Sequence, residues 1–256
     1  QDYWVIKLDA NGNILWQNTI GGKGEDVLKD IHETADNGFI LGGTSYSGIN
    51  GDKTEPHLGN SDYWIVKLNS EGEILWQNTI GGNRDEGFET VFQTSDGGYI
   101  LGGISDSGIS GDKTENSDNE NWDLWIVKTD ENGNVQWDNT ICSEEDDRFS
   151  SVKQTNDNGF IIFAYSDGQI SCDKTEGPIN FSTDLWIIKL NNSGSIEWQE
   201  IIGGNSDDQA AFIEQSADGS YIIASTSNSG ISGDKTDANY GTSYDYWVIK
   251  IDVSGS

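Results

Sequence analysis

The stretch Asp62–Gly82, DYWIVKLNSEGEILWQNTIGG, recurs along this chain. Similar stretches begin at Asp2, Asp123 and Asp184, and a partial copy, DYWVIKIDVSGS, begins at Asp245. The leading aspartates are therefore 60 or 61 residues apart. A fixed period of this size is the sequence signature of a repeat protein. Residues 1–256 are accordingly predicted to form one domain built from repeats.

Nine of the ten tryptophans follow the same period. One register contains Trp4, Trp64, Trp125, Trp186 and Trp247, and the other contains Trp16, Trp76, Trp137 and Trp198. Large rings at such regular positions are typical of a hydrophobic core. We therefore expect an ordered protein, although the apolar content is only 34%.

Each repeat contains four segments with the composition of β-strands. In the first repeat they are residues 4–8, 14–20, 28–34 and 39–45. Asn11-Gly12-Asn13 and Asp36-Asn37-Gly38 have the composition of hairpin turns between them. No segment shows helical periodicity, so the sequence predicts an all-β fold.

Four short strands in a repeat of about 60 residues are typical of one blade of a β-propeller. With the third segment innermost, one blade comprises residues 28–34, 39–45, 64–68 and 75–80. This phasing leaves two outer strands at the N-terminus and three strands at the C-terminus. Strands from both termini are therefore expected to close a ring of four blades. Residues 4–8 and 247–251 would then compete for one position, unless one end is displaced, pairs with another molecule, or belongs to a longer array.

The pattern Asp-Tyr/Leu-Trp-Ile/Val-Val/Ile-Lys-Leu, followed by Gly-x-Ile/Val-x-Trp and Ile-Gly-Gly, resembles the bacterial β-propeller repeats of secreted proteins. It looks most like copies from large extracellular proteins of Bacteroidetes-type bacteria, and it is also similar to quinoprotein propeller repeats. The resemblance covers essentially the whole chain. It implies the propeller fold and an extracellular or cell-surface location, but no particular activity.

The net charge of -30 limits the partners that the chain can bind. Nucleic acids are bound through Lys and Arg, and 14 basic residues stand against 44 acidic ones. Nucleic acids are therefore not expected as partners, and anionic membrane surfaces are disfavoured for the same reason. No apolar run reaches the ~18–20 residues of a membrane-spanning helix, so we expect no membrane insertion.

The two cysteines replace glycines of the other repeats, and both lie in one repeat. Cys142 corresponds to Gly21, Gly81 and Gly203, and Cys172 corresponds to Gly51, Gly111 and Gly233. Two such changes together predict a disulfide and an oxidising, extracytoplasmic setting. The alternative is a pair of unrelated thiols. Gln1 and the absence of Met favour a processed or excised chain.

Two sets of acidic loops are predicted to lie on one face of the propeller, where they could bind Ca²⁺ through carboxylate and carbonyl oxygens. The candidate ligands are Asp52, Asp112, Asp173 and Asp234 in the long Gly-Asp-Lys-Thr loops, and Asp26, Asp85, Asp146 and Asp207 in the short ones. Alternatively, each aspartate caps a turn and is neutralised by the following lysine, such as Lys53. No other cofactor is indicated.

The sequence gives little indication of a catalytic site or of a zinc site. Lys7 and its equivalents Lys67, Lys128, Lys189 and Lys250 recur within strands, and we expect them to form structural ion pairs from blade to blade or to reach solvent. His32 and His57 occupy unrelated positions, so a zinc site is not expected. No nucleophile elbow, P-loop or dinucleotide-binding motif is present.

The tips of the long loops differ between repeats and carry aromatic residues, namely Trp122, Phe181, Tyr240 and Tyr244. Aromatic rings among Asn, Asp, Gly and Ser suit carbohydrate stacking or protein docking, although they could also pack only their own loops. We therefore expect a secreted or surface-attached, non-enzymatic binding and adhesion module for an extracellular polysaccharide or protein. The alternatives are a glycosidase or lyase with its cleft on the same face, and a structural spacer of a large adhesin. Self-association through an unpaired terminal strand is a further expectation.

Overall fold

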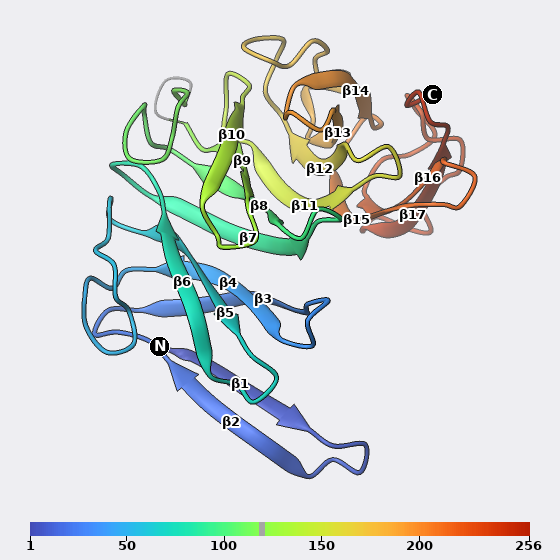
Figure 1. The fold of residues 1–256 in the computed structure, drawn as a ribbon. Helices are drawn as coiled ribbons and strands as arrows, with labels where there is room; N and C mark the ends of the chain where they lie inside the picture. Colours follow the sequence, from blue (N-terminus) through green and yellow to red (C-terminus); the bar gives the residue numbers. More distant parts are fainter. Residues whose placement is uncertain (118–120) are drawn as a thin grey trace. The chain divides into compact units, whose positions relative to one another are not determined.

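The computed structural model describes residues 1–117 and 121–256 and groups the chain into two compact units. Unit 1 contains Gln1–Asn116 and Ile126–Asp138, and unit 2 contains Ser117–Trp125 and Asn139–Ser256. Both consist of antiparallel β-sheets (Figure 1). In the described residues the only helical segment is the 3-10 turn η1, Ile179–Phe181, and no helix could span a membrane. The all-β expectation is confirmed.

Unit 1 contains a two-stranded sheet and two four-stranded sheets. The two-stranded sheet pairs β1 (Tyr3–Leu8) with β2 (Ile14–Ile20). The next comprises β3 (Asp26–Glu33), β4 (Phe39–Ser45), β5 (Asp62–Leu68) and β6 (Ile74–Ile80). The third comprises β7 (Glu86–Gln93), β8 (Tyr99–Ser105), β9 (Asp123–Thr129) and β10 (Val135–Ile141). The first residues of β9 and the last of β10 are counted with unit 2.

Unit 2 contains one four-stranded and one three-stranded sheet. The four-stranded sheet comprises β11 (Arg148–Gln154), β12 (Phe160–Ser166), β13 (Asp184–Leu190) and β14 (Ile196–Ile202). The three-stranded sheet comprises β15 (Asp208–Gln215), β16 (Tyr221–Ser227) and β17 (Asp245–Ile251).

The expected grouping of strands is confirmed for the three four-stranded sheets. Each complete sheet follows the chain from its first to its fourth strand, beginning with the strand that was expected to be innermost. The hairpin β1–β2 and the sheet β15–β17 are separate sheets, and no closed ring occurs among the strands that the structure describes. A four-bladed propeller therefore stays a prediction.

The first strand of each sheet starts earlier than the sequence predicted, because it contains a β-bulge. In β3 the register shifts between Leu28 and Asp30, and in β7 between Phe88 and Thr90. Equivalent shifts occur in β11 and β15. A bulge adds one unpaired residue and breaks the alternation of inward and outward side chains. The residues before the bulge therefore do not look like a strand in the sequence.

Successive sheets within unit 1 pack face to face through tyrosine. The Tyr3 ring lies 4.9 Å from the Trp64 ring, and the Tyr3 hydroxyl donates to the Trp64 carbonyl at 3.1 Å. A Cβ atom added to Gly42 would lie 2.1 Å from the Phe88 ring. Close packing against a side chain of the next sheet thus requires glycine at position 42.

The tryptophans of the second register also join neighbouring sheets. Trp76 packs edge-on against Tyr99 at 5.7 Å and lies over Gly133, whose added Cβ would be 2.7 Å from the Trp76 ring. In unit 2, Trp198 contacts Tyr221 in the same way at 6.0 Å. Burial of such a ring contributes about 2–3 kcal/mol, so these contacts are a main source of cohesion.

The repeated mid-strand lysines are structural, as expected, although their ion pairs lie within one sheet. Lys67 is buried, and its ammonium donates to the Leu68 carbonyl at 3.0 Å and pairs with Asp36 at 2.9 Å. Asp36 lies in the turn between β3 and β4 of the same sheet. Equivalent pairs join Lys128 to Asp96, Lys189 to Asp157 and Lys250 to Asp218.

Candidate functional site

The short acidic loop and the long loop of each repeat are joined by a pair of reciprocal hydrogen bonds, which we call the loop clasp. The Asp112 backbone N–H donates to the Gly81 carbonyl at 2.9 Å, and the Gly81 N–H donates to Asp112 Oδ2 at 3.2 Å. The same pair joins Gly21 to Asp52, Cys142 to Asp173 and Gly203 to Asp234. The two loop sets therefore meet within each repeat.

A second carboxylate lies buried beneath each clasp. Glu86 accepts hydrogen bonds from the Ser105 hydroxyl at 2.9 Å and from the Gly82 N–H at 2.9 Å, and it also accepts one from the Ser107 hydroxyl. Asp26, Asp147 and Asp208 occupy the same position in the other repeats and are also buried. Each accepts a backbone N–H four residues before it, from Gly22, Ser143 and Gly204.

Burial disfavours the ionised form of several of these carboxyl groups. It raises the pKa of Glu86 to about 7 and that of Asp147 to about 6. The pKa of Asp184, at the start of β13, is likewise raised to about 7 by burial and by the nearby charge of Asp208. A raised pKa suits a catalytic acid, but these groups are enclosed by their serine and backbone partners.

The calcium candidates are spread among separate contacts. Asp52, Asp112, Asp173 and Asp234 hold the clasps, and Asp26 lies beneath one of them. Asp85 accepts from the Ser61 hydroxyl at 2.9 Å, and Asp146 and Asp207 accept backbone N–H groups of Trp122 and Thr183. The one convergent group of three potential ligand side chains in the described residues is Cys142, Cys172 and Asp173, whose sulfurs are already bonded to each other. This geometry favours the turn-cap interpretation.

The alternative in which the following lysine neutralises the clasp aspartate is wrong for Lys53 and Lys174. Lys53 is buried, its ammonium lies 5.4 Å from the centre of the Trp64 ring, and it donates a hydrogen bond to Thr79. Lys174 lies over Trp186 in the same way, at 5.2 Å. Asp52 and Lys53 lie in a turn closed by the Lys53 N–H, which donates to the Asn50 carbonyl at 3.1 Å; from this turn the lysine reaches inward to Thr79, while the aspartate reaches Gly21 of the short loop. Burial lowers the pKa of Lys53 to about 8.

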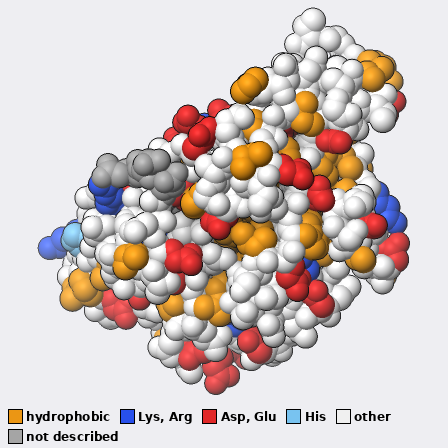
Figure 2. Space-filling model, turned by 90° about the horizontal axis from the view of Figure 1, so that it is seen from above, with side chains coloured by type: hydrophobic (Ala, Val, Ile, Leu, Met, Phe, Trp, Pro, Cys, Tyr) orange, Lys and Arg blue, Asp and Glu red, His pale blue; other side chains and the backbone are white. Residues whose placement is uncertain are grey.

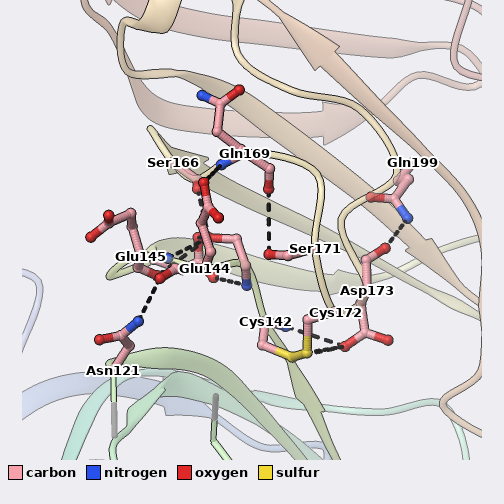
Figure 3. The surroundings of a disulfide bond; sticks show 12 residues. Asn121, Cys142, Glu144, Glu145, Ser166, Gln169, Ser171, Cys172, Asp173 and Gln199 are labelled. Carbon is pink, nitrogen blue, oxygen red and sulfur yellow. Dashed lines mark hydrogen bonds between the residues drawn. A yellow bond between two sulfur atoms is a disulfide. The ribbon is translucent and has the colours of Figure 1, made fainter. Parts of the chain in front are cut away.

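The predicted disulfide is confirmed between Cys142 and Cys172, whose Cα atoms are 5.6 Å apart (Figure 3). It joins the same two loops as the clasp, and the Asp173 carboxylate lies beside it. Cys172 has a φ of 55°, and the glycines at this position, Gly51 and Gly111, have φ of 58° and 55°. The cysteine thus keeps a backbone conformation that normally favours glycine.

The aromatic tip residues differ in exposure. Phe181 and Tyr240 are 83% and 95% exposed, Tyr244 is 43% exposed, and Trp122 is partly buried with its backbone N–H bonded to Asp146. No contact between any two of these four rings occurs in the described residues. The variable tip 116–122 lies partly outside the described residues. The structure therefore displays Phe181 and Tyr240 as separate rings on different loops.

Phe181 lies in a turn that hydrogen bonds hold in one conformation. Asn180 and Phe181 have φ of 56° and 59°, which is unusual for residues with side chains. The turn is fixed by the Ser182 hydroxyl, which donates to the Ile179 carbonyl at 2.6 Å, and by the Ile179 N–H, which donates to Asp184. Such strain persists only where surrounding contacts impose it and often marks functional positions.

Two features of this region were missed by sequence reasoning. The isoleucine of each Ser-Gly-Ile or Gly-Gln-Ile segment is exposed, by 63–69%, at Ile49, Ile109, Ile170 and Ile231. A hollow of about 700 Å³ lies along the long loop of the last repeat and β17, and Thr236, Tyr240 and Trp247 contribute to its lining. The repetition of the isoleucine and the incomplete last repeat were the signals available for them.

Acidic side chains dominate the charged surface. On the face drawn in Figure 2 they occur in several groups, and basic side chains are few. This distribution agrees with the composition of 44 acidic and 14 basic residues. A polyanionic ligand would be repelled there.

Comparisons with known proteins add little. No family model matches the chain, and no curated protein matches it. Among solved structures, it is similar to a protein of unknown function from Bacteroides caccae, with a TM-score of 0.38 and 11% sequence identity over 99% of this chain and 91% of that one. That likeness carries no argument about fold or function.

Proposed function

We propose that this chain is an extracellular or cell-surface, non-enzymatic β-propeller module that binds an uncharged polysaccharide through the tips of its long loops. The main support for this proposal is the exposed position of the Phe181 ring. Its ring is 83% exposed on a turn whose backbone is strained and fixed by hydrogen bonds. An immobilised aromatic ring binds a sugar face with little loss of side-chain entropy.

The base of each loop supports a scaffold role. Its polar groups are used in the clasp and beneath it, so the tips can vary without loss of the sheets that carry them. The disulfide supports an oxidising compartment, because such bonds persist mainly outside the cytoplasm. The acidic surface disfavours polyanionic glycans.

A hydrolase or lyase would need accessible carboxyl groups. The groups with the strongly raised pKa values, Glu86, Asp147 and Asp184, are buried and do not line the hollow beside β17. This separation supports a binding role over catalysis.

The test is a glycan array followed by affinity electrophoresis in gels that contain the best neutral polysaccharide. The wild-type chain is expected to be retarded, and Phe181→Ala should lose most of the retardation. Ile170→Ala is the matched control, because Ile170 is 65% exposed on the same long loop. Equal retardation of wild type and Phe181→Ala would contradict the proposal, and binding only to immobilised proteins would point to a protein ligand.

A further inference from the structure

The two loops that the disulfide joins in unit 2 bring three potential metal ligands together. The Cys142 Sγ lies 3.4 Å from Asp173 Oδ2, and the Cys172 Sγ lies 4.0 Å from the same oxygen. Figure 3 shows the Asp173 carboxylate beside both sulfurs. In the part of the chain that the structure describes, no other group of three His, Cys, Asp or Glu side chains converges in this way. While the sulfurs are bonded to each other, neither can act as a thiolate ligand.

The two loops do not need the disulfide to stay together. In the other three repeats glycines replace both cysteines, yet the same clasp joins the loops. Their backbones also approach closely, since a Cβ atom added to Gly51, Gly111 or Gly233 would lie 2.3–2.4 Å from the carbonyl oxygen of the facing glycine. In the disulfide repeat, the Asp173 N–H donates to the Cys142 carbonyl at 3.2 Å. Reduction is therefore expected to leave the two thiols and the carboxylate side by side.

A reductant can reach the disulfide from one side. Cys172 is exposed, whereas Cys142 is buried. A dithiol reduces such a bond by exchange: its own two thiols become a disulfide, and each cysteine sulfur gains one proton. The two cysteine thiols then release these protons when a metal ion binds them as thiolates.

We propose that reduction of the Cys142–Cys172 disulfide creates a binding site for a thiophilic divalent metal ion such as Zn²⁺, with both thiolates and the Asp173 carboxylate as ligands. Two sulfur ligands suit Zn²⁺ and not Ca²⁺, which is bound through oxygen. Tetrahedral Zn²⁺, with bonds of about 2.3 Å to sulfur and about 2.1 Å to oxygen, places these atoms about 3.6 Å apart. The two sulfur–oxygen distances in the structure are close to this value. Water takes the fourth position.

The surroundings of the site favour a cation. Glu144, Glu145 and Asp146 follow Cys142 closely in the chain and are exposed. Lys174 does not neutralise the neighbouring Asp173, because it is buried and its ammonium donates to the Gly168 carbonyl at 2.9 Å. Exposed carboxylates raise the local concentration of metal ions. The thiolates that select a thiophilic ion are present only in the reduced chain.

Titration with Co²⁺, a spectroscopic substitute for Zn²⁺, tests the proposal. The chain is reduced, separated from the reductant by gel filtration under nitrogen, and titrated with Co²⁺ alone, and circular dichroism shows whether it stays folded. One Co²⁺ is expected to bind per chain, with the near-ultraviolet charge-transfer band of cobalt–thiolate bonds and the visible bands of a tetrahedral ion. Zn²⁺ should displace the Co²⁺ and remove both features. The oxidised chain should show neither of them.

Matched variants separate the metal ligands from the clasp. In the reduced chain, Asp173→Asn should bind Co²⁺ at least about tenfold more weakly, because the carboxylate ligand is lost. Asp112→Asn changes the same clasp position in a repeat without cysteines, so it should leave the affinity unchanged. Cys172→Gly restores the glycine of the other repeats and should abolish binding at the concentrations that saturate the reduced wild type.

Equal affinities of Asp173→Asn and Asp112→Asn would overturn the proposed set of ligands. Cobalt spectra without a thiolate band, or equal binding by the oxidised chain, would overturn the site itself. Loss of the β-sheet signal on reduction would do the same, because the loops would then not hold the thiols together. The site does not involve Phe181, so failure of the proposed glycan binding would leave this test unaffected.

Discussion

Asp234 and Gly203 hold two loops together from both directions, since the Asp234 N–H donates to the Gly203 carbonyl at 2.9 Å and the Gly203 N–H donates to Asp234 Oδ2 at 3.1 Å. These residues are 31 apart in the sequence and belong to different connections between strands. Three other repeats contain the same clasp. A charged acceptor that bonds a backbone N–H contributes more than a neutral one.

Removal of one clasp side chain should destabilise the chain moderately. Asp112→Ala leaves the Gly81 N–H without its carboxylate partner, so we expect the free energy of unfolding to fall by about 1–3 kcal/mol. Asp112→Asn keeps an acceptor oxygen and should cost less. Urea unfolding checks both, and a larger loss for Asn than for Ala would contradict the role of the clasp.

Calcium should have little effect on stability if these aspartates act as turn caps. The melting temperature in millimolar Ca²⁺ is expected to stay within about 1 °C of that in a chelator, because a ligand that binds only the folded state must raise it. Mg²⁺ serves as the control for ionic effects. A large rise specific to Ca²⁺ would restore the metal interpretation of Asp52, Asp112, Asp173 and Asp234.

The chain should be more stable near pH 5 than near pH 7.5. Burial raises the pKa of Glu86 and of Asp184 from 4.5 and 3.8 to about 7, so the folded state holds more protons than the unfolded state between these values. The free energy of unfolding therefore falls as the pH rises through this window. Urea midpoints at the two pH values measure the effect.

The free energy of unfolding should also fall at low pH, but for a different reason. Hydrogen bonds from Thr34 and Lys67 lower the pKa of Asp36 to about 2, and bonds from Ser220 and Lys250 lower that of Asp218 to about 2. Their stabilisation is present above pH 3.8 and is lost as the pH falls towards 2. Asp184→Asn should flatten the change between pH 5 and pH 7.5, whereas Asp218→Asn should not.

The disulfide should contribute through the loop that it closes. For a separation of 30 residues, its loss is expected to cost about 3–4 kcal/mol. Cys142→Ala/Cys172→Ala keeps the positive φ that Cys172 already has and should show this loss alone. Cys142→Gly/Cys172→Gly restores the residues of the other repeats and should lose about 1 kcal/mol less, because glycine at position 172 relieves the strain of the positive φ. Equal stabilities of the two variants would contradict this account.

Packing of Trp76 against a glycine turn can be measured by a matched pair of substitutions. Gly133 and Gly97 have φ of 82° and 87°, but an added Cβ meets the Trp76 ring at 2.7 Å only at Gly133. Gly97→Ala should cost about 1 kcal/mol of backbone strain. Gly133→Ala should cost about 1–3 kcal/mol more through overpacking, and equal costs would show that the contact is unimportant.

Much of the fold could be predicted from the sequence because the turns repeat. Gly12 and Gly72 fix the hairpins, and the bounds of β2 and β4 agree with the prediction. The start of β3 could not be read, since its bulge follows Leu28 and interrupts the alternation. Whether four sheets form a closed ring depends on contacts between segments far apart, which local patterns do not encode.

The candidate site was only partly predictable. The glycine replacements at Cys142 and Cys172 led directly to the disulfide, because two changes in one repeat are informative. The contact of Lys53 with Trp64 could not be predicted, because it depends on packing between the long loop and β5. The strain at Phe181 was also hidden, because a positive φ at an aromatic residue leaves no trace in composition.

The identity of β2 and β6 has a consequence for folding. Two strands with the sequence ILWQNTI cannot be distinguished by their partners, so the unfolded chain can pair either one with either β1 or β5. Such degenerate pairings are competing states that roughen the energy landscape. The Cys142–Cys172 disulfide lies in a different repeat, so it does not remove this ambiguity. The short turns at Gly12 and Gly72 do, because closing the short loop of a native hairpin costs less entropy than pairing distant strands.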